Sequence, residues 1–116
     1  MNGKNMLTVK KENKQEILII TISGRLDGLT SKQFLDEIES MVSTTENKVI
    51  LNLNTLDYIS SEGLRSVLTT AKKIKSLDGK FGLCSPLSGV KEVLEISGFG
   101  AMLGVYETEE LAIANI

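Results

Sequence analysis

The residues with the clearest potential for chemistry are two adjacent serines, Ser60 and Ser61, between an apolar run and an amphipathic one. A hydroxyl at the start of a helix accepts hydrogen bonds from free backbone N–H groups, and the helix dipole favours negative charge there. Such a position accommodates a phosphate, so the pair suits a modifiable switch better than a nucleophile. The plainer alternative is a serine that only caps the helix, and residue chemistry alone favours that alternative.

Nothing else in the chain supports catalysis by these serines. The 116 residues contain no histidine, which removes the commonest general base and the commonest metal ligand. The nearest lysines on the same helix begin at Lys72, more than two turns from Ser61. The sequence has neither a glycine-flanked nucleophile elbow nor a glycine-rich phosphate loop. We therefore predict a protein that is not an enzyme, with no catalytic residue, no metal site and no cofactor.

Composition sets further bounds on the class of protein. A net charge of −2 and a pI near 5.2 argue against binding of nucleic acid. No apolar run approaches the ~20 residues that span a bilayer, and the N-terminus lacks the apolar core of a signal peptide. The single cysteine, Cys84, cannot form an internal disulfide, which fits a reducing compartment. We expect one domain over 1–116, cytoplasmic, without membrane insertion, and either monomeric or weakly dimeric.

Hydrophobic periodicity predicts the elements that position the serines. Apolar and β-branched runs predict strands at 6–11, 17–23, 49–54, 80–84 and 103–106, the first two as a hairpin that ends at Gly24. Helices are expected after Thr30, which forms a capping box with Gln33, and from the serine pair to Gly79. Two more are expected, from Ser85-Pro86 to Gly98 and from Thr108 to 114.

This order of elements predicts the class of fold. Strands that alternate with helices need parallel crossovers, whereas a short connector makes the first pair antiparallel. We expect an α/β domain with a mixed, mostly parallel sheet, an N-terminal antiparallel hairpin and about four helices packed on it. In the helix after the serines, the stripe Leu64, Val67, Leu68, Ala71 and Ile74 faces the core, and Ser66 is expected on the wet face.

Several other residues have two open interpretations. Asp27 either caps the helix near Thr30 or lies beside Ser61, because loops after parallel strands gather at one edge of the sheet. Arg65, one turn after Ser61, either pairs with a phosphate or a partner carboxylate or is simply solvated. Leu29 and Met102 are either exposed interface anchors or core residues. Asp57 is expected in a turn, and Cys84 is expected to be buried and inert.

In this order of elements, three motifs together resemble the STAS domain. They are the serine pair with Gly63-Leu64 after an apolar strand, the Gly24-x-Leu26-Asp27 loop, and the Ser97-Gly98-Phe99 stop. The resemblance covers nearly the whole chain and implies the STAS fold. STAS domains occur as bacterial anti-sigma factor antagonists and as cytoplasmic parts of sulphate transporters.

Alignment with the antagonist family on Gly63-Leu64 places the family's switch serine at Ser61. Ser60 then stands where the family usually has Asp, and Glu62 stands where it has Ser or Thr. Ser60 is the alternative phosphosite, but as the natural N-cap it is expected to be engaged with backbone N–H groups. The resemblance, with the residue arguments above, implies a partner-binding set of Asp27, Ser60, Ser61, Glu62 and Arg65.

The same resemblance implies a partner-switching cycle. The unphosphorylated protein would bind an anti-sigma factor that is also its serine kinase, phosphorylation of Ser61 would release it, and a phosphatase would reset the switch. Transcription that depends on the sigma factor would be regulated in this way. Two alternatives stay open: a scaffold or regulatory subunit of another signalling or transport assembly, and a module that binds lipid or a small ligand.

Overall fold

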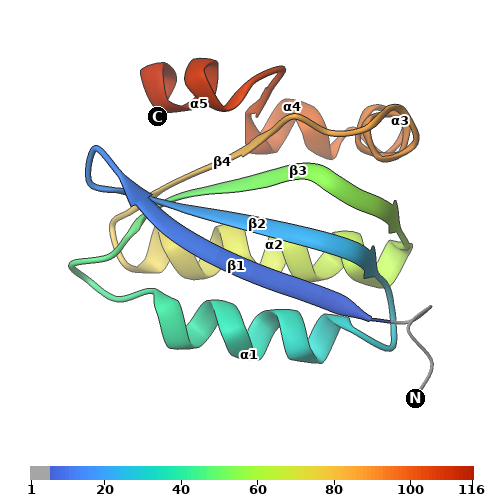
Figure 1. Ribbon diagram of the computed structural model, residues 1–116, viewed down its shortest axis with the longest axis horizontal. Helices are drawn as coiled ribbons and strands as arrows, with labels where there is room; N and C mark the ends of the chain where they lie inside the picture. Colours follow the sequence, from blue (N-terminus) through green and yellow to red (C-terminus); the bar gives the residue numbers. More distant parts are fainter. Residues whose placement is uncertain (1–5) are drawn as a thin grey trace.

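The computed structural model describes residues 6–116, which contain five strands and five helices (Figure 1). In chain order these are β1 (Leu7–Lys14), β2 (Ile17–Leu26), α1 (Ser31–Met41), β3 (Lys48–Ile59), α2 (Ser61–Ser76), β4 (Lys80–Cys84), α3 (Ser88–Ser97), α4 (Phe99–Leu103), β5 (Val105–Tyr106) and α5 (Glu109–Asn115). None of these helices is long and apolar enough to cross a bilayer.

The strands form one sheet in the order β1-β2-β3-β4-β5. β1 is antiparallel to β2, and the other three pairs are parallel, which confirms the predicted mixed sheet with an antiparallel hairpin. The carboxyl ends of β2 and β3 and the starts of α1 and α2 meet at one edge (Figure 1). We call this the carboxyl edge.

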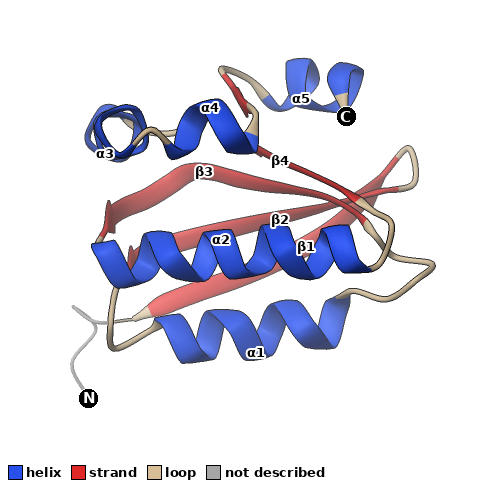
Figure 2. Ribbon diagram, turned by 180° about the vertical axis from the view of Figure 1, so that it is seen from behind, coloured by secondary structure: helices blue, strands red, loops and turns tan. Residues whose placement is uncertain are grey.

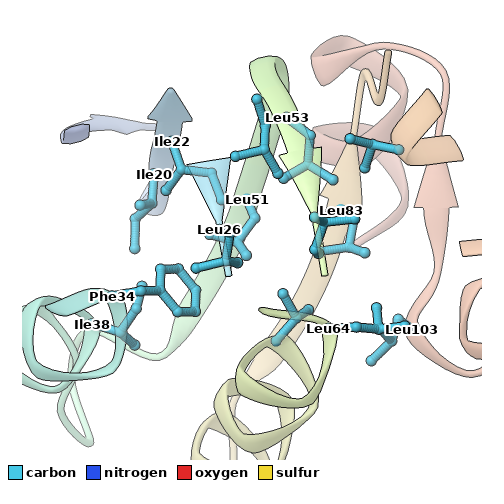
Figure 3. Close-up of a cluster of buried hydrophobic side chains, with 14 of the residues drawn as sticks. Ile20, Ile22, Leu26, Phe34, Ile38, Leu51, Leu53, Leu64, Leu83 and Leu103 are labelled. Atoms are coloured by element: carbon cyan, nitrogen blue, oxygen red, sulfur yellow. The ribbon is translucent and has the colours of Figure 1, made fainter. Parts of the chain in front are cut away.

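Alternation along the strands produces a core on each face of the sheet. In β2, Leu18 and Ile20 point into the main core with α1 to α4, whereas Ile17 and Ile19 pack against Ala112 of α5 on the other face. Figure 2 shows α2 in front of the sheet, running roughly along β2, with α1 beside it. Figure 3 shows part of the main core, to which the strands and helices contribute side chains such as Phe34, Ile38, Leu51, Leu64, Leu83 and Leu103.

Two strands continue beyond their predicted ends. β2 does not end at Gly24 but runs to Leu26, because Gly24 has φ +99° and the Arg25 N–H donates to the Met6 carbonyl at 3.3 Å. A Cβ on Gly24 would lie 2.3 Å from that carbonyl oxygen, so glycine allows the close approach. β3 runs to Ile59 beside the extended β2, and the prediction of a turn at Asp57 is wrong.

The helices correct further details of the prediction. Thr30 has helical backbone angles and its hydroxyl accepts from the Asp27 N–H and donates to the Arg25 carbonyl, so it forms no capping box with Gln33. Ser85 has φ +58° and helix α3 begins only at Ser88, so the predicted cap at Ser85-Pro86 is wrong. The sequence pattern does not predict the five-residue helix α4. Because α4 includes Leu103, the last strand, β5, begins at Val105 and not at Leu103.

The last helix and the burial of the cysteine agree with prediction. The Thr108 hydroxyl caps α5 by accepting from the Leu111 N–H at 3.1 Å, and Cys84 is fully buried under that helix. Glu109 of α5 accepts hydrogen bonds from Lys14 and from Asn52, which joins α5 to the carboxyl end of β1 and to the middle of β3. The terminal helix is therefore held by both apolar and polar contacts.

Candidate functional site

The start of α2 presents the two serines in different roles. The Ser60 hydroxyl accepts a hydrogen bond from the Gly63 N–H at 3.1 Å, and its carbonyl accepts from the Leu64 N–H at 2.8 Å. Ser60 is therefore the N-cap, as predicted. Ser61 is the first helical residue and is exposed to solvent. Of the two hydroxyls, that of Ser60 is the one engaged in the cap.

The first turn of α2 lies directly against the end of β2. The Ser60 N–H donates to the Leu26 carbonyl at 3.0 Å. A Cβ on Gly63 would lie 2.1 Å from the same carbonyl oxygen and 3.1 Å from Cγ1 of Ile59. Only glycine permits this approach, so Gly63 fixes the height of Ser61 above the carboxyl edge.

Asp27 caps the loop that leads into α1. Its Oδ1 accepts from the N–H groups of Leu29 (3.0 Å) and Thr30 (3.2 Å), and its Oδ2 lies 3.4 Å from Nε of Arg25. Burial alone would raise the pKa of the Asp27 carboxyl, but these hydrogen bonds outweigh it and hold the pKa below its ordinary value. The loop after β2 is therefore ordered by a charged Asp27, which is the capping interpretation of this residue.

The Asp27 loop and the start of α2 are nonetheless neighbours. The Glu62 carboxylate packs over Gly28, where an added Cβ would lie 3.1 Å from its Oε2. The structure thus brings Asp27, Ser60, Ser61 and Glu62 to one edge of the sheet. Arg65 is also exposed, one turn along α2 from Ser61, and forms no salt bridge within residues 6–116.

Sequence reasoning missed a pair of side chains beside this edge. Arg25 and Tyr58 are cross-strand partners in the pairing of β2 with β3, and the guanidinium lies 4.2 Å from the centre of the Tyr58 ring. Tyr58 remains 42% exposed. Both residues lie on strand extensions that the sequence pattern did not predict, so their stacking becomes visible only in the folded structure.

The exposure of the apolar side chains settles two open interpretations. Leu29 is 75% exposed and Met102 is 73% exposed, so neither is a core residue. Leu29 lies on the loop that Asp27 orders. Met102 lies on α4 next to Leu103, which packs in the same core cluster as Leu64 of α2 (Figure 3). Both are available for contacts with another molecule.

Ser66, which is predicted to lie on the solvent-exposed face of α2, is instead buried, with 3% of its surface exposed. Its hydroxyl donates to the Gly63 carbonyl at 2.6 Å, so the side chain satisfies its polar group within its own helix. The predicted apolar stripe of α2 does face the core.

Comparison with known proteins assigns the chain to a family. The family model described as STAS domain matches residues 8–112. BtrV of Bordetella bronchiseptica, named as a candidate anti-sigma factor antagonist, is 39% identical over 98 residues, 84% of each chain. The anti-sigma F factor antagonist of Paenibacillus polymyxa is 25% identical over 111 residues, 95% of each chain.

Solved structures agree with these sequence relatives. Unphosphorylated SpoIIAA, an anti-sigma factor antagonist, superposes with a TM-score of 0.72 at 25% identity, over 91% of this chain and 93% of its own. A candidate antagonist from Thermotoga maritima shares the fold with a TM-score of 0.85 at 22% identity, over 93% of each chain. The family match, the identity to BtrV and the fold agree, and the chain belongs to the STAS domain family.

Proposed function

We propose that the chain is an anti-sigma factor antagonist that binds its partner through the carboxyl edge and is released when Ser61 is phosphorylated. The names of its relatives support antagonism of an anti-sigma factor. The observation that carries the switch is local: Ser60 occupies the cap, so Ser61 stands exposed at the first position of α2. SpoIIAA, which is 25% identical, has been solved in unphosphorylated and phosphorylated forms.

A phosphate on Ser61 would change the charge of this edge without disturbing the fold. The Ser60 cap leaves the first-turn N–H groups of Ser61 and Glu62 without intrahelical acceptors, and a phosphate carrying about −1.5 to −2 charges suits such a helix start. Next to the Glu62 carboxylate it produces a strongly negative patch. Desolvation and repulsion of about 3–4 kcal/mol at an interface would weaken binding several hundred-fold.

Exposed side chains around Ser61 give the interface its other components. Leu29 is an apolar side chain on an ordered loop, and Tyr58 offers an aromatic face already stacked on Arg25. Glu62 and Arg65 add one charge of each sign. Aromatic and apolar anchors surrounded by charged groups are typical of protein interfaces. Asp27 contributes mainly by holding Leu29 in place, since its oxygens accept hydrogen bonds from its own loop.

The proposed partner is an anti-sigma factor with serine kinase activity, opposed by a phosphatase. Binding would sequester the anti-sigma factor and so free a sigma factor for transcription in the cytoplasm. In this cycle the chain is the substrate and the ligand of its partner, and performs no catalysis itself.

Paired affinity captures from the source cell test this function. Tagged Ser61→Ala and Ser61→Asp proteins are used as baits, with Ser60→Ala as the matched neighbour, and captured proteins are identified by mass spectrometry. We expect a kinase-like anti-sigma factor on the Ser61→Ala and Ser60→Ala baits and its loss from Ser61→Asp. The captured partner, purified and given ATP, should phosphorylate the wild-type chain but not Ser61→Ala. Equal capture by all baits would reject the charge switch.

A further inference from the structure

The sheet has two edge strands, β1 and β5, and within residues 6–116 only β1 is protected against further pairing. The outer edge of β1 carries Lys10, Lys11 and Lys14, and lysines on an edge strand discourage another strand from adding to it. The opposite edge is β5, which contains only Val105 and Tyr106 and has neither a lysine nor a proline. An unprotected edge offers backbone hydrogen bonds to another chain.

The pairing with β4 shows which backbone groups of β5 are available. The carbonyls of Gly104 and Tyr106 accept from the N–H groups of β4 and of Ser85, at 3.0 and 2.9 Å. Since alternate residues of a strand face opposite neighbours, the N–H and carbonyl of Val105 point away from β4. Within residues 6–116 neither group has a hydrogen-bond partner in another loop or a side chain.

A hollow lies beside this edge, between β5 and the helices α3 and α4. Its volume is about 670 Å³, and its walls include apolar side chains such as Leu94, Ala101 and Val105. Leu94 is buried and forms part of the floor, while Gly98 and Gly100 keep the helix turn free of side chains. The combination of an edge strand, a neighbouring helix and an apolar hollow is the geometry that receives an extended peptide.

The charges around the hollow indicate the chemistry of that peptide. Two carboxylates, Glu95 and Glu107, and one ammonium group, Lys91, line it. None of the three forms a salt bridge within residues 6–116. The net negative charge favours a segment with basic residues, and the floor favours a small aliphatic side chain.

We infer that the β5 edge and this hollow form a second docking site, which takes an extended basic–aliphatic peptide segment of another protein as an added strand. The central residue of the segment pairs with Val105, its aliphatic side chain enters the hollow, and its basic side chains lie near Glu95 and Glu107. The site uses neither Ser61 nor the proposed switch, so it stands or falls independently of the proposed function.

The test uses a defined probe, an acetylated and amidated peptide of three valines flanked by lysines. We expect saturable binding in the high micromolar to millimolar range, with ¹⁵N chemical shifts moving at Val105, Tyr106 and Glu107. The same peptide with glutamates in place of the lysines should not bind. Two further versions of the peptide carry N-methyl groups on alternate backbone amides. The version whose methyl group removes the N–H that donates to the Val105 carbonyl should lose binding.

Variants of the protein separate backbone pairing from simple charge attraction. Val105→Pro removes the outward N–H, and Ala101→Trp fills the hollow without altering the strand. Each substitution should weaken binding of the peptide probe about fivefold or more. Glu95→Lys with Glu107→Lys should weaken it about tenfold, whereas Glu110→Lys on α5, the matched control, should change it less than twofold.

Circular dichroism identifies any variant that fails to fold. If Val105→Pro fails to fold, Ala101→Trp and the N-methylated probes still decide whether the peptide pairs with the β5 edge. The inference is overturned if the basic probe shows no saturable binding up to several millimolar. It is also overturned if both N-methylated probes bind as well as the parent, or if the shifts map to other acidic surfaces.

Discussion

Replacement of Gly63 by alanine tests how the switch serine is positioned. By helix propensity alone, Gly→Ala inside α2 would stabilise the protein by about 1 kcal/mol. The structure predicts the opposite sign, because the new Cβ would lie 2.1 Å from the Leu26 carbonyl oxygen and 2.7 Å from its carbon. Those atoms belong to the backbone of β2, so no side chain can rotate to make room.

The size of the destabilisation by Gly63→Ala follows from which groups must move to make room for the new Cβ. Lifting the first turn of α2 off β2 lengthens the hydrogen bond from the Ser60 N–H to Leu26, a loss of about 1 kcal/mol. Overpacking against backbone and Ile59 adds about 1–3 kcal/mol. After subtraction of the propensity gain, we expect a net destabilisation of about 1–3 kcal/mol. For a domain of this size that corresponds to a fall in Tm of about 4–12 °C.

Urea denaturation followed by circular dichroism measures this effect, with Gly89→Ala as the matched control. Gly89 also lies early in a helix, but a Cβ there meets no atom within 4 Å. The control should therefore be neutral or stabilised by up to about 1 kcal/mol. If Gly63→Ala is as stable as Gly89→Ala, the close approach of α2 to β2 is wrong, and with it the account of how Ser61 is held.

Three further predictions concern single groups. Ser60→Ala should lower the free energy of unfolding by about 0.5–2 kcal/mol in urea titrations, whereas Ser61→Ala should stay within about 0.5 kcal/mol; equal effects would mean that the cap is misassigned. Because the pKa of Asp27 is lowered in the folded state, its charge stabilises the protein above the ordinary aspartate pKa of about 4. This contribution is lost as the pH falls through the folded pKa, so Asp27→Asn should be less stable than wild type at pH 7, and the difference should shrink as the pH is lowered below about 4; a pH-independent difference would contradict this. Burial raises the pKa of the Cys84 thiol to about 11, so at pH 8 iodoacetamide should alkylate it at least a hundredfold more slowly in native protein than in urea; comparable rates would mean that the thiol is accessible.

The sequence was sufficient where local chemistry decides the structure. Apolar periodicity located β4 at its observed bounds, and cap chemistry distinguished Ser60 from Ser61. Prediction failed where a segment distant in the sequence decides the local structure. Gly24 was interpreted as a strand end, but its positive φ serves the approach of Met6, which sequence spacing cannot show.

The same limit applies to the candidate site. The polar residues after Asn54 belong to β3 only because the extended β2 pairs with them, and that pairing places Tyr58 against Arg25. The sequence around Tyr58 or Arg25 contains no motif that indicates a functional site. The contact of Glu62 with Gly28 joins two segments more than thirty positions apart, and it too required the fold.

The order of the strands in the sheet has a consequence for how the chain reaches this structure. Each strand pairs with the one that precedes it along the chain, so no strand has to insert between two that are already joined. Pairings between nearby segments lose less loop-closure entropy and are associated with faster folding. During synthesis, β1 and β2 can form their hairpin before α1 and β3 leave the ribosome, and each later unit adds to a growing edge. The edge at which that growth stops is β5.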